Sequence, residues 1–64
     1  MFEFIDPRSV EAGMRLNLEY APGRETDALV RRVEHSEDGT TVIFYARFGP
    51  VGPYNQDDML LRVG

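Results

Sequence analysis

Leu29-Val30-Arg31-Arg32-Val33-Glu34-His35 and Thr41-Val42-Ile43-Phe44-Tyr45-Ala46-Arg47-Phe48 are two runs of strand-forming residues on either side of Asp38-Gly39. Asp-Gly between β-branched and aromatic runs predicts a tight hairpin, because glycine accepts the positive φ that such turns need. The hairpin is the centre of the predicted fold, and the rest of the chain is interpreted around it.

The register of this hairpin decides which side chains face the core. With His35 opposite Thr40 across a loop from Ser36 to Gly39, Val33 is expected opposite Val42, and alternation then turns one apolar set inward. The expected inward set is Leu29, Val33, Val42, Phe44, Ala46 and Phe48. Arg31 would interrupt this set, so a β-bulge is expected there that turns its guanidinium outward.

Three further strands bring the predicted number to five. Phe2 to Ile5 is a short edge strand that ends at Asp6-Pro7, because proline fixes φ and cannot donate to a ladder. Met14 to Tyr20 alternates apolar and polar residues with a period of two, which is typical of a half-buried strand. Met59 to Val63 is the last strand, and one helical or 3₁₀ turn over Tyr54 to Asp58 is expected before it.

The segments between these strands are rich in turn-forming residues. Arg8 to Gly13 is expected to hold one helical or 3₁₀ turn, with Ser9 as its N-cap. Ala21 to about Asp27 is expected to be a loop, because it contains the turn pair Pro-Gly. Gly49 to Pro53 is expected to be a rigid connector without regular structure, because prolines and glycines alternate in it. The sequence thus predicts a single all-β domain over residues 1–64.

Length and composition restrict the possible functions. The chain has 64 residues, no cysteine and one histidine, so disulfides cannot stabilise its small core, and self-association is an alternative source of stability. A formal net charge of −4 disfavours non-specific binding to nucleic acid or to anionic membranes. The first residues do not resemble a signal peptide, and no stretch approaches the ~20 apolar residues of a membrane-spanning helix. A soluble, cytoplasmic protein is therefore expected.

All seven basic side chains of the chain are arginine. One explanation is the codon bias of a GC-rich genome. The other is that some of these guanidiniums serve a contact surface, where arginine is enriched and lysine depleted. The sequence leaves both explanations open.

No group of residues predicts catalysis, metal binding or a cofactor. His35 is interpreted as a solvated residue beside the hairpin turn, and Ser9 has no base close to it in the sequence. The adjacent carboxylates of Asp57-Asp58 are interpreted as caps of the turn before the last strand. The glycines of Gly49 to Pro53 alternate with prolines, which lack the amide donors of a phosphate-binding loop. The chain is therefore not expected to be an enzyme.

Several short motifs follow the order found in a known class of small barrels. A glycine precedes an alternating strand in Ala12-Gly13-Met14-Arg15-Leu16, and a hydrophobic run, Val42-Ile43-Phe44, follows the turn glycine. An aromatic-glycine pair, Phe48-Gly49, and a closing strand, Met59-Leu60-Leu61, come next. This order resembles the Tudor group of SH3-like domains over Val10 to Val63. The resemblance implies a small five-stranded barrel with a short helical or 3₁₀ turn before the last strand.

The resemblance also implies a type of ligand. Some Tudor domains hold methylated arginine or lysine in an aromatic cage by cation-π interaction. Phe44 and Phe48 would match two cage aromatics, with Tyr20 or Tyr54 nearby. The chain departs from the pattern at Thr26-Asp27-Ala28, where an aromatic is expected. Phe44 and Phe48 are therefore expected in the core rather than in a cage.

The run from Thr41 to Phe48 is apolar on both faces, and this feature carries the functional prediction. If Phe44 faces the core, its neighbours Ile43 and Tyr45 face outward, where they would form an apolar contact surface edged by arginine. The predicted partner-binding residues are Arg32, Ile43, Tyr45, Arg47 and Tyr54.

The predicted function is a non-enzymatic protein-interaction module, of the kind expected for a bacterial or phage accessory factor. It would dock on a partner protein or form a homo-oligomer, without a cofactor, a metal or a membrane. The alternative is a Tudor-like or OB-like barrel that binds single-stranded RNA or DNA through stacking aromatics and arginines.

Overall fold

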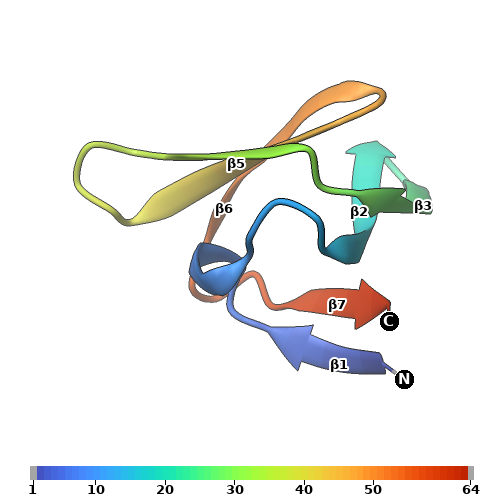
Figure 1. Ribbon diagram of the computed structural model, residues 1–64, viewed down its shortest axis with the longest axis horizontal. Helices are drawn as coiled ribbons and strands as arrows, with labels where there is room; N and C mark the ends of the chain where they lie inside the picture. Colours follow the sequence, from blue (N-terminus) through green and yellow to red (C-terminus); the bar gives the residue numbers. More distant parts are fainter. Residues whose placement is uncertain (1, 64) are drawn as a thin grey trace.

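The computed structural model describes residues 2–63 and consists of β-strands joined by turns, with a single 3₁₀ turn in that range (Figure 1). The elements are β1 (Phe2–Ile5), η1 (Pro7–Ser9), β2 (Arg15–Ala21), β3 (Arg24–Leu29), β4 (Arg32–His35), β5 (Thr41–Ala46), β6 (Gly49–Asn55) and β7 (Leu60–Val63). The prediction of an all-β fold is confirmed. The number of strands differs, because residues 2–63 contain seven where the sequence predicts five.

The strands form two antiparallel sheets. The first sheet has the order β1-β7-β2-β3 and the second has the order β4-β5-β6. In Figure 1, β1 and β7 lie side by side near the chain ends, and β5 and β6 lie across the molecule from them. Within residues 2–63 the two sheets are not joined into a closed barrel.

The chain passes from the first sheet to the second at Val30 and Arg31. The Val30 N–H donates to the carbonyl of Met14 at 2.8 Å, and the next N–H, that of Arg31, donates to the carbonyl of Tyr45 at 2.8 Å. The predicted single strand is therefore split into β3 and β4, and its alternation changes phase at the crossing. Val30 is buried, whereas Leu29, which is expected inward, is exposed.

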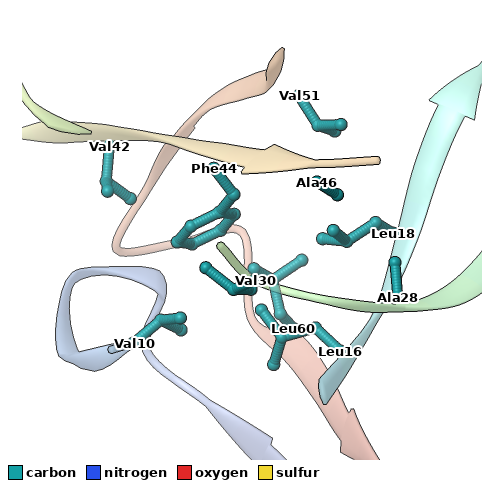
Figure 2. Close-up of a cluster of buried hydrophobic side chains, with 10 residues drawn as sticks. All are labelled: Val10, Leu16, Leu18, Ala28, Val30, Val42, Phe44, Ala46, Val51 and Leu60. Atoms are coloured by element: carbon teal, nitrogen blue, oxygen red, sulfur yellow. The ribbon is translucent and has the colours of Figure 1, made fainter. Parts of the chain in front are cut away.

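The hydrophobic core lies between the two sheets (Figure 2). Its buried apolar residues are Val10, Leu16, Leu18, Ala28, Val30, Val42, Phe44, Ala46, Val51 and Leu60. The inward orientation predicted for Val42, Phe44 and Ala46 is confirmed, and Val33 and Phe48 pack against the core while half-buried. Phe44 is fully enclosed, and its ring stacks on that of Tyr54 with centroids 5.5 Å apart.

The β4–β5 hairpin has a register two residues away from the predicted one. Val33 pairs with Phe44 rather than with Val42, and His35 pairs with Val42. The Ser36 N–H donates to the carbonyl of Thr41 at 3.0 Å, so Thr40 belongs to the loop rather than to the strand. Because the shift is an even number of residues, each side chain of β5 keeps its predicted face.

Asp38 organises the tip of this hairpin and explains the shift. Its Oδ1 accepts hydrogen bonds from Ser36 Oγ at 2.7 Å, from Thr40 Oγ1 at 2.8 Å and from Thr40 N at 3.1 Å. These bonds hold Thr40 inside the loop. They also favour the charged carboxylate, and together they lower the pKa of Asp38 from 3.8 to about 2, with the Ser36 hydroxyl as the largest cause.

We expect the contribution of Asp38 to stability to be lost only in strong acid. Because the pKa is lowered in the folded state, the contribution is present above pH 3.8 and disappears as the pH falls through about 2. An NMR titration of the Asp38 carboxyl should show a midpoint near 2, and Ser36→Ala should move it toward the ordinary value. An unshifted midpoint in the parent protein would contradict the three hydrogen bonds.

The predicted loop from Ala21 to Asp27 is wrong, because most of it is strand. β2 ends at Ala21 and β3 begins at Arg24, so the connection is only Pro22-Gly23. Gly23 has a φ of 74°, which lets a two-residue turn reverse the chain. Thr26 and Asp27 pair with β2 on the far side of this turn.

The predicted irregular connector from Gly49 to Pro53 is also wrong, because it forms most of β6. Gly49 pairs with Ala46 and Pro50 with Tyr45 of β5. β6 is an edge strand, where a missing N–H can face solvent, and its pairing with β5 is interrupted at Gly52-Pro53. Edge positions and bulges are the places where a sheet accepts proline.

The turns are placed differently from the prediction. The 3₁₀ turn η1 lies near the start of the chain, and its N-cap is Asp6 rather than Ser9, with Asp6 Oδ1 accepting from Arg8 N at 2.9 Å. Tyr54 belongs to β6 and not to the turn before β7. In that turn Asp58 Oδ2 accepts from Asn55 N at 2.9 Å, which confirms the capping role expected at this position.

Candidate functional site

The five predicted partner-binding residues lie on more than one surface. Arg32, Ile43 and Tyr45 share one face of the β4–β5 hairpin, where Arg32 stands opposite Tyr45. Arg47 follows β5 and lines a hollow that contains none of those three residues. Tyr54 packs against Phe44 and the core. The single contact surface expected from the sequence is thus divided.

The β5 outer face, which we define as Arg32, Ile43 and Tyr45, is held together by a cation-π contact. The Arg32 guanidinium carbon lies 4.0 Å from the centroid of the Tyr45 ring. The predicted register, with Val33 opposite Val42, would place Ile43 opposite Arg32, and the two-residue shift of register accounts for the difference. Arg32 Nη2 also lies 3.5 Å from Glu34 Oε2. Ile43 and Tyr45 are half-buried, so this face offers limited apolar area.

The aromatic residues that would match a Tudor cage do not line an open cage. Phe44 is fully buried and is therefore inaccessible to a ligand. Phe48 is half-buried and its ring lies 5.3 Å from that of Tyr20, centroid to centroid. The expectation that Phe44 and Phe48 serve the core is supported for both residues.

Of the four exposed large hydrophobic side chains among the described residues, three lie on the outer face of the first sheet, called the sheet face below, and the fourth is Tyr20. Phe4 is 68% exposed, Met59 49% and Leu29 46%. Leu16 and Leu18 point into the core, so the residues between and beside them point outward. The pairs on this face are Arg15–Leu29, Asn17–Asp27 and Glu19–Glu25 between β2 and β3, and Phe4–Leu61 between β1 and β7.

One end of the sheet face is an acidic hollow with a volume of about 440 Å³. Its carboxylates are Glu19, Glu25 and Asp58, and its apolar residues include Phe4, Met59 and Leu61. Glu19 and Glu25 stand directly opposite each other, an arrangement of like charges that destabilises a strand pair.

Tyr54 lies at the wall of the acidic hollow. Burial raises the pKa of its hydroxyl, and the negative charges of Glu19 and Asp58 raise it further. The raised pKa favours the neutral phenol, and Glu19 and Asp58 are the two carboxylates of the hollow that contribute to it.

The other end of the sheet face is a basic hollow with a volume of about 340 Å³. Arg15 from β2, Arg31 from the crossing and Arg47 from the β5–β6 connection line it, together with Leu29 and Asp27. These three arginines form no ion pair with a carboxylate of residues 2–63, whereas the arginines that do form one are Arg8, Arg32 and Arg62. The arginines of the basic hollow are thus available to an external anion.

Sequence reasoning missed both hollows. The sequence contains one indication of them, on the polar side of the alternating strand Met14 to Tyr20. The first and last polar residues of this side, Arg15 and Glu19, carry opposite charges. The sequence does not indicate the contribution of β3, because Arg24 to Asp27 lie in the predicted loop. The approach of Arg31 and Arg47 depends on the crossing between sheets.

The remaining observations bear on other kinds of site. In the described part of the chain, no group of three His, Cys, Asp or Glu side chains could hold a metal ion. No helix within residues 2–63 is long and apolar enough to cross a membrane. Comparison with protein-family models, with curated protein sequences and with solved structures gives no match. The sheet face is therefore the candidate site on geometric grounds.

Proposed function

We propose that the chain is a non-enzymatic protein-interaction module, and that the sheet face is its docking surface. The observation that carries this proposal is the exposure of Phe4, Met59 and Leu29 on one face of a small domain. Phe4 and Met59 line the same hollow, whereas Leu29 lines the other one. Large exposed apolar patches are uncommon on monomeric soluble proteins and are typical of interaction sites. Aromatic residues, methionine and arginine, which are all present on this face, are the types enriched at protein interfaces.

We further propose that the two sheets are the halves of a small SH3-like barrel of Tudor-like type. If β3 and β4 are counted as one strand bent at Val30 and Arg31, and β1 as an addition at the edge, the seven strands reduce to the five of such a barrel. The consecutive hydrogen bonds of Val30 and Arg31 to different sheets support this interpretation. An accessory role on a larger bacterial or phage assembly would suit such a module.

The β5 outer face is a second candidate surface of the same module. The stacking of Arg32 on Tyr45 supports it, because an aromatic side chain edged by arginine is common at interface centres. Its apolar residues are more buried than those of the sheet face, so we rank it second.

A nucleic-acid partner is the alternative from another class, and the basic hollow is the observation that favours it. Three arginines that form no ion pair with a carboxylate of residues 2–63 could contact phosphates. The net charge of −4 and the acidic hollow on the same face oppose it. Binding of labelled single-stranded RNA or DNA that weakens steeply as salt increases would support this alternative.

The proposed function is tested by comparing two surface variants in affinity capture from the native cell. Phe4→Ser with Met59→Ser changes the sheet face, and Ile43→Thr with Tyr45→Thr changes the β5 outer face while keeping strand-forming residues. We expect the first variant to lose the proteins that the parent captures and the second to retain them. Far-UV circular dichroism checks that both variants fold. Capture that is equal for parent and both variants would overturn the proposal.

A further inference from the structure

We propose that the sheet face binds the sheet face of a second copy of this chain, with the Glu19 end of β2 in each copy over the Arg15 end of β2 in the other. The inference deepens the proposed function, on which it rests, by naming the partner. It starts from the charge pattern along β2. Arg15 lies at the basic end and Glu19 at the acidic end, about 13 Å apart for four residues at about 3.3 Å each.

Within residues 2–63, like charges gather at both ends of the sheet face without an ion pair to compensate them. Glu19 faces Glu25 directly, with Asp58 at the same hollow. At the other end, Arg15, Arg31 and Arg47 gather around one carboxylate, that of Asp27, without forming an ion pair with it. Like charges held together in this way are unfavourable, and a surface of opposite charge relieves them. One chain carries both of the complementary surfaces.

A two-fold axis matches the two ends at once. If the axis lies in the interface and runs across the strands at the level of Asn17, β2 of one copy lies antiparallel over β2 of the other. Arg15 of each copy then meets Glu19 of the other, as expected for an isologous interface. Asn17 donates to Asp27 at 3.2 Å, so this carboxylate near the axis is already hydrogen-bonded.

The apolar residues of the sheet face suit the same arrangement. The register that pairs Leu16 with Arg62 brings Leu61 to the level of Asn17, and Phe4 stands opposite Leu61. Phe4 and Leu61 therefore lie near the proposed axis, where each copy meets its own counterpart. A 68% exposed phenyl ring beside a hollow of about 440 Å³ supplies both an anchor and a space for it on the same face.

The size of the surface is sufficient for a dimer. A standard interface buries about 800 Å² on each partner. The chain exposes 4339 Å², so about 800 Å² is roughly a fifth of its accessible surface. The molecule measures 29 × 23 × 22 Å, and one large face of a block of this size makes up a similar fraction of the surface of the block. A 64-residue domain with a small core would also gain from the additional burial.

Sedimentation velocity of the purified chain up to about 1 mM, at low and moderate salt, tests the proposal. We expect dimers that weaken as salt increases. Arg15→Glu and Glu19→Arg, each alone, should weaken association at least about tenfold, because each places like charges in contact twice per dimer. Arg24→Glu, at an exposed position outside both hollows, is the matched control and should leave association unchanged.

Mixing the Arg15→Glu variant with the Glu19→Arg variant should restore dimers. In the mixed dimer the introduced carboxylate at position 15 of one copy faces the introduced guanidinium at position 19 of the other. The second contact of the same dimer joins the unchanged Glu19 of the first copy to the unchanged Arg15 of the second. Both contacts therefore pair opposite charges again, as they do in the parent dimer.

Several outcomes would overturn the dimer. A parent chain that stays monomeric throughout the concentration range refutes the dimer. If, in that case, the parent captures a protein that the Phe4→Ser, Met59→Ser variant does not capture, the proposed function stands and the partner is that protein. Assemblies that grow beyond two copies indicate head-to-tail association rather than a two-fold dimer. Two reversed variants that do not combine on mixing show that Arg15 and Glu19 are not opposed. Salt-sensitive RNA binding by the parent without dimers assigns the basic hollow to nucleic acid.

Discussion

Phe44→Ala should destabilise the fold by about 3 to 5 kcal/mol, the range measured when a buried aromatic ring is truncated. The ring is fully enclosed between the two sheets and stacks on Tyr54 at 5.5 Å, so little of the space it leaves can be refilled by solvent-facing groups. At about 0.05 to 0.15 kcal/mol per residue, a domain of this length has a total stability of roughly 3 to 10 kcal/mol. The substitution therefore removes between about a third and all of it.

Urea unfolding followed by far-UV circular dichroism measures this effect. Phe4→Ala is the matched control at a protein concentration low enough for the chain to be monomeric, because the same side chain is 68% exposed in the single chain and its removal should then change stability by less than about 0.5 kcal/mol. If Phe44→Ala does not fold at all, Phe44→Leu gives a smaller loss that can still be measured. Equal stability of the variants at positions 4 and 44 would contradict the burial of Phe44.

The strands with clear alternation were predictable from the sequence. β1, β2, β5 and β7 lie within one or two residues of their predicted bounds, and the inward residues of β5 are those expected. In these segments the side-chain pattern and the backbone preference point to the same structure. The even shift of register in the β4–β5 hairpin did not affect the facing of its side chains.

β3 and β6 could not be predicted because tertiary position overrides local preference in both. Pro22-Gly23 marks a turn, but nothing local shows that the turn is only two residues long and that pairing resumes at Arg24. Pro50 and Pro53 are poor strand residues that an edge position accepts. At Val30 the alternation of inward and outward side chains changes, because the chain enters a second sheet. An alternating pattern in the sequence does not show where a chain passes from one sheet to another.

The candidate site was less predictable than the fold. The sequence pointed to Ile43 and Tyr45, because a run that is apolar on both faces stands out in a single chain. The sheet face gathers charged and apolar side chains from several strands. Two of its principal residues, Glu25 and Asp27, lie where the sequence predicts a loop, and a third, Leu29, is predicted to face inward. Surfaces made from paired strands require the register before they can be recognised.

Gly52→Ala should destabilise the fold through two separate effects at the irregular part of β6. Gly52 has a φ of 127°, a conformation that costs a residue with a side chain about 1 to 3 kcal/mol. A Cβ at this position would also lie 3.0 Å from the carbonyl oxygen of Val42 and 3.3 Å from the backbone nitrogen and ring of Tyr54. The backbone oxygen of β5 cannot move away without disturbing its pairing with β6, so the steric effect adds to the conformational one.

Gly49→Ala separates these two effects. Gly49 has a φ of 100°, but a Cβ there would meet nothing within 4 Å, so its substitution reports the conformational cost alone. We expect Gly49→Ala to lower the urea midpoint and Gly52→Ala to lower it further. In Gly52→Ala the amides of β6 should also lose protection against hydrogen exchange before those of β2, because the contact forces β5 and β6 apart locally. If the two variants are equally stable, then the close approach of Gly52 to Val42, and with it the described path of β6 along β5, is incorrect.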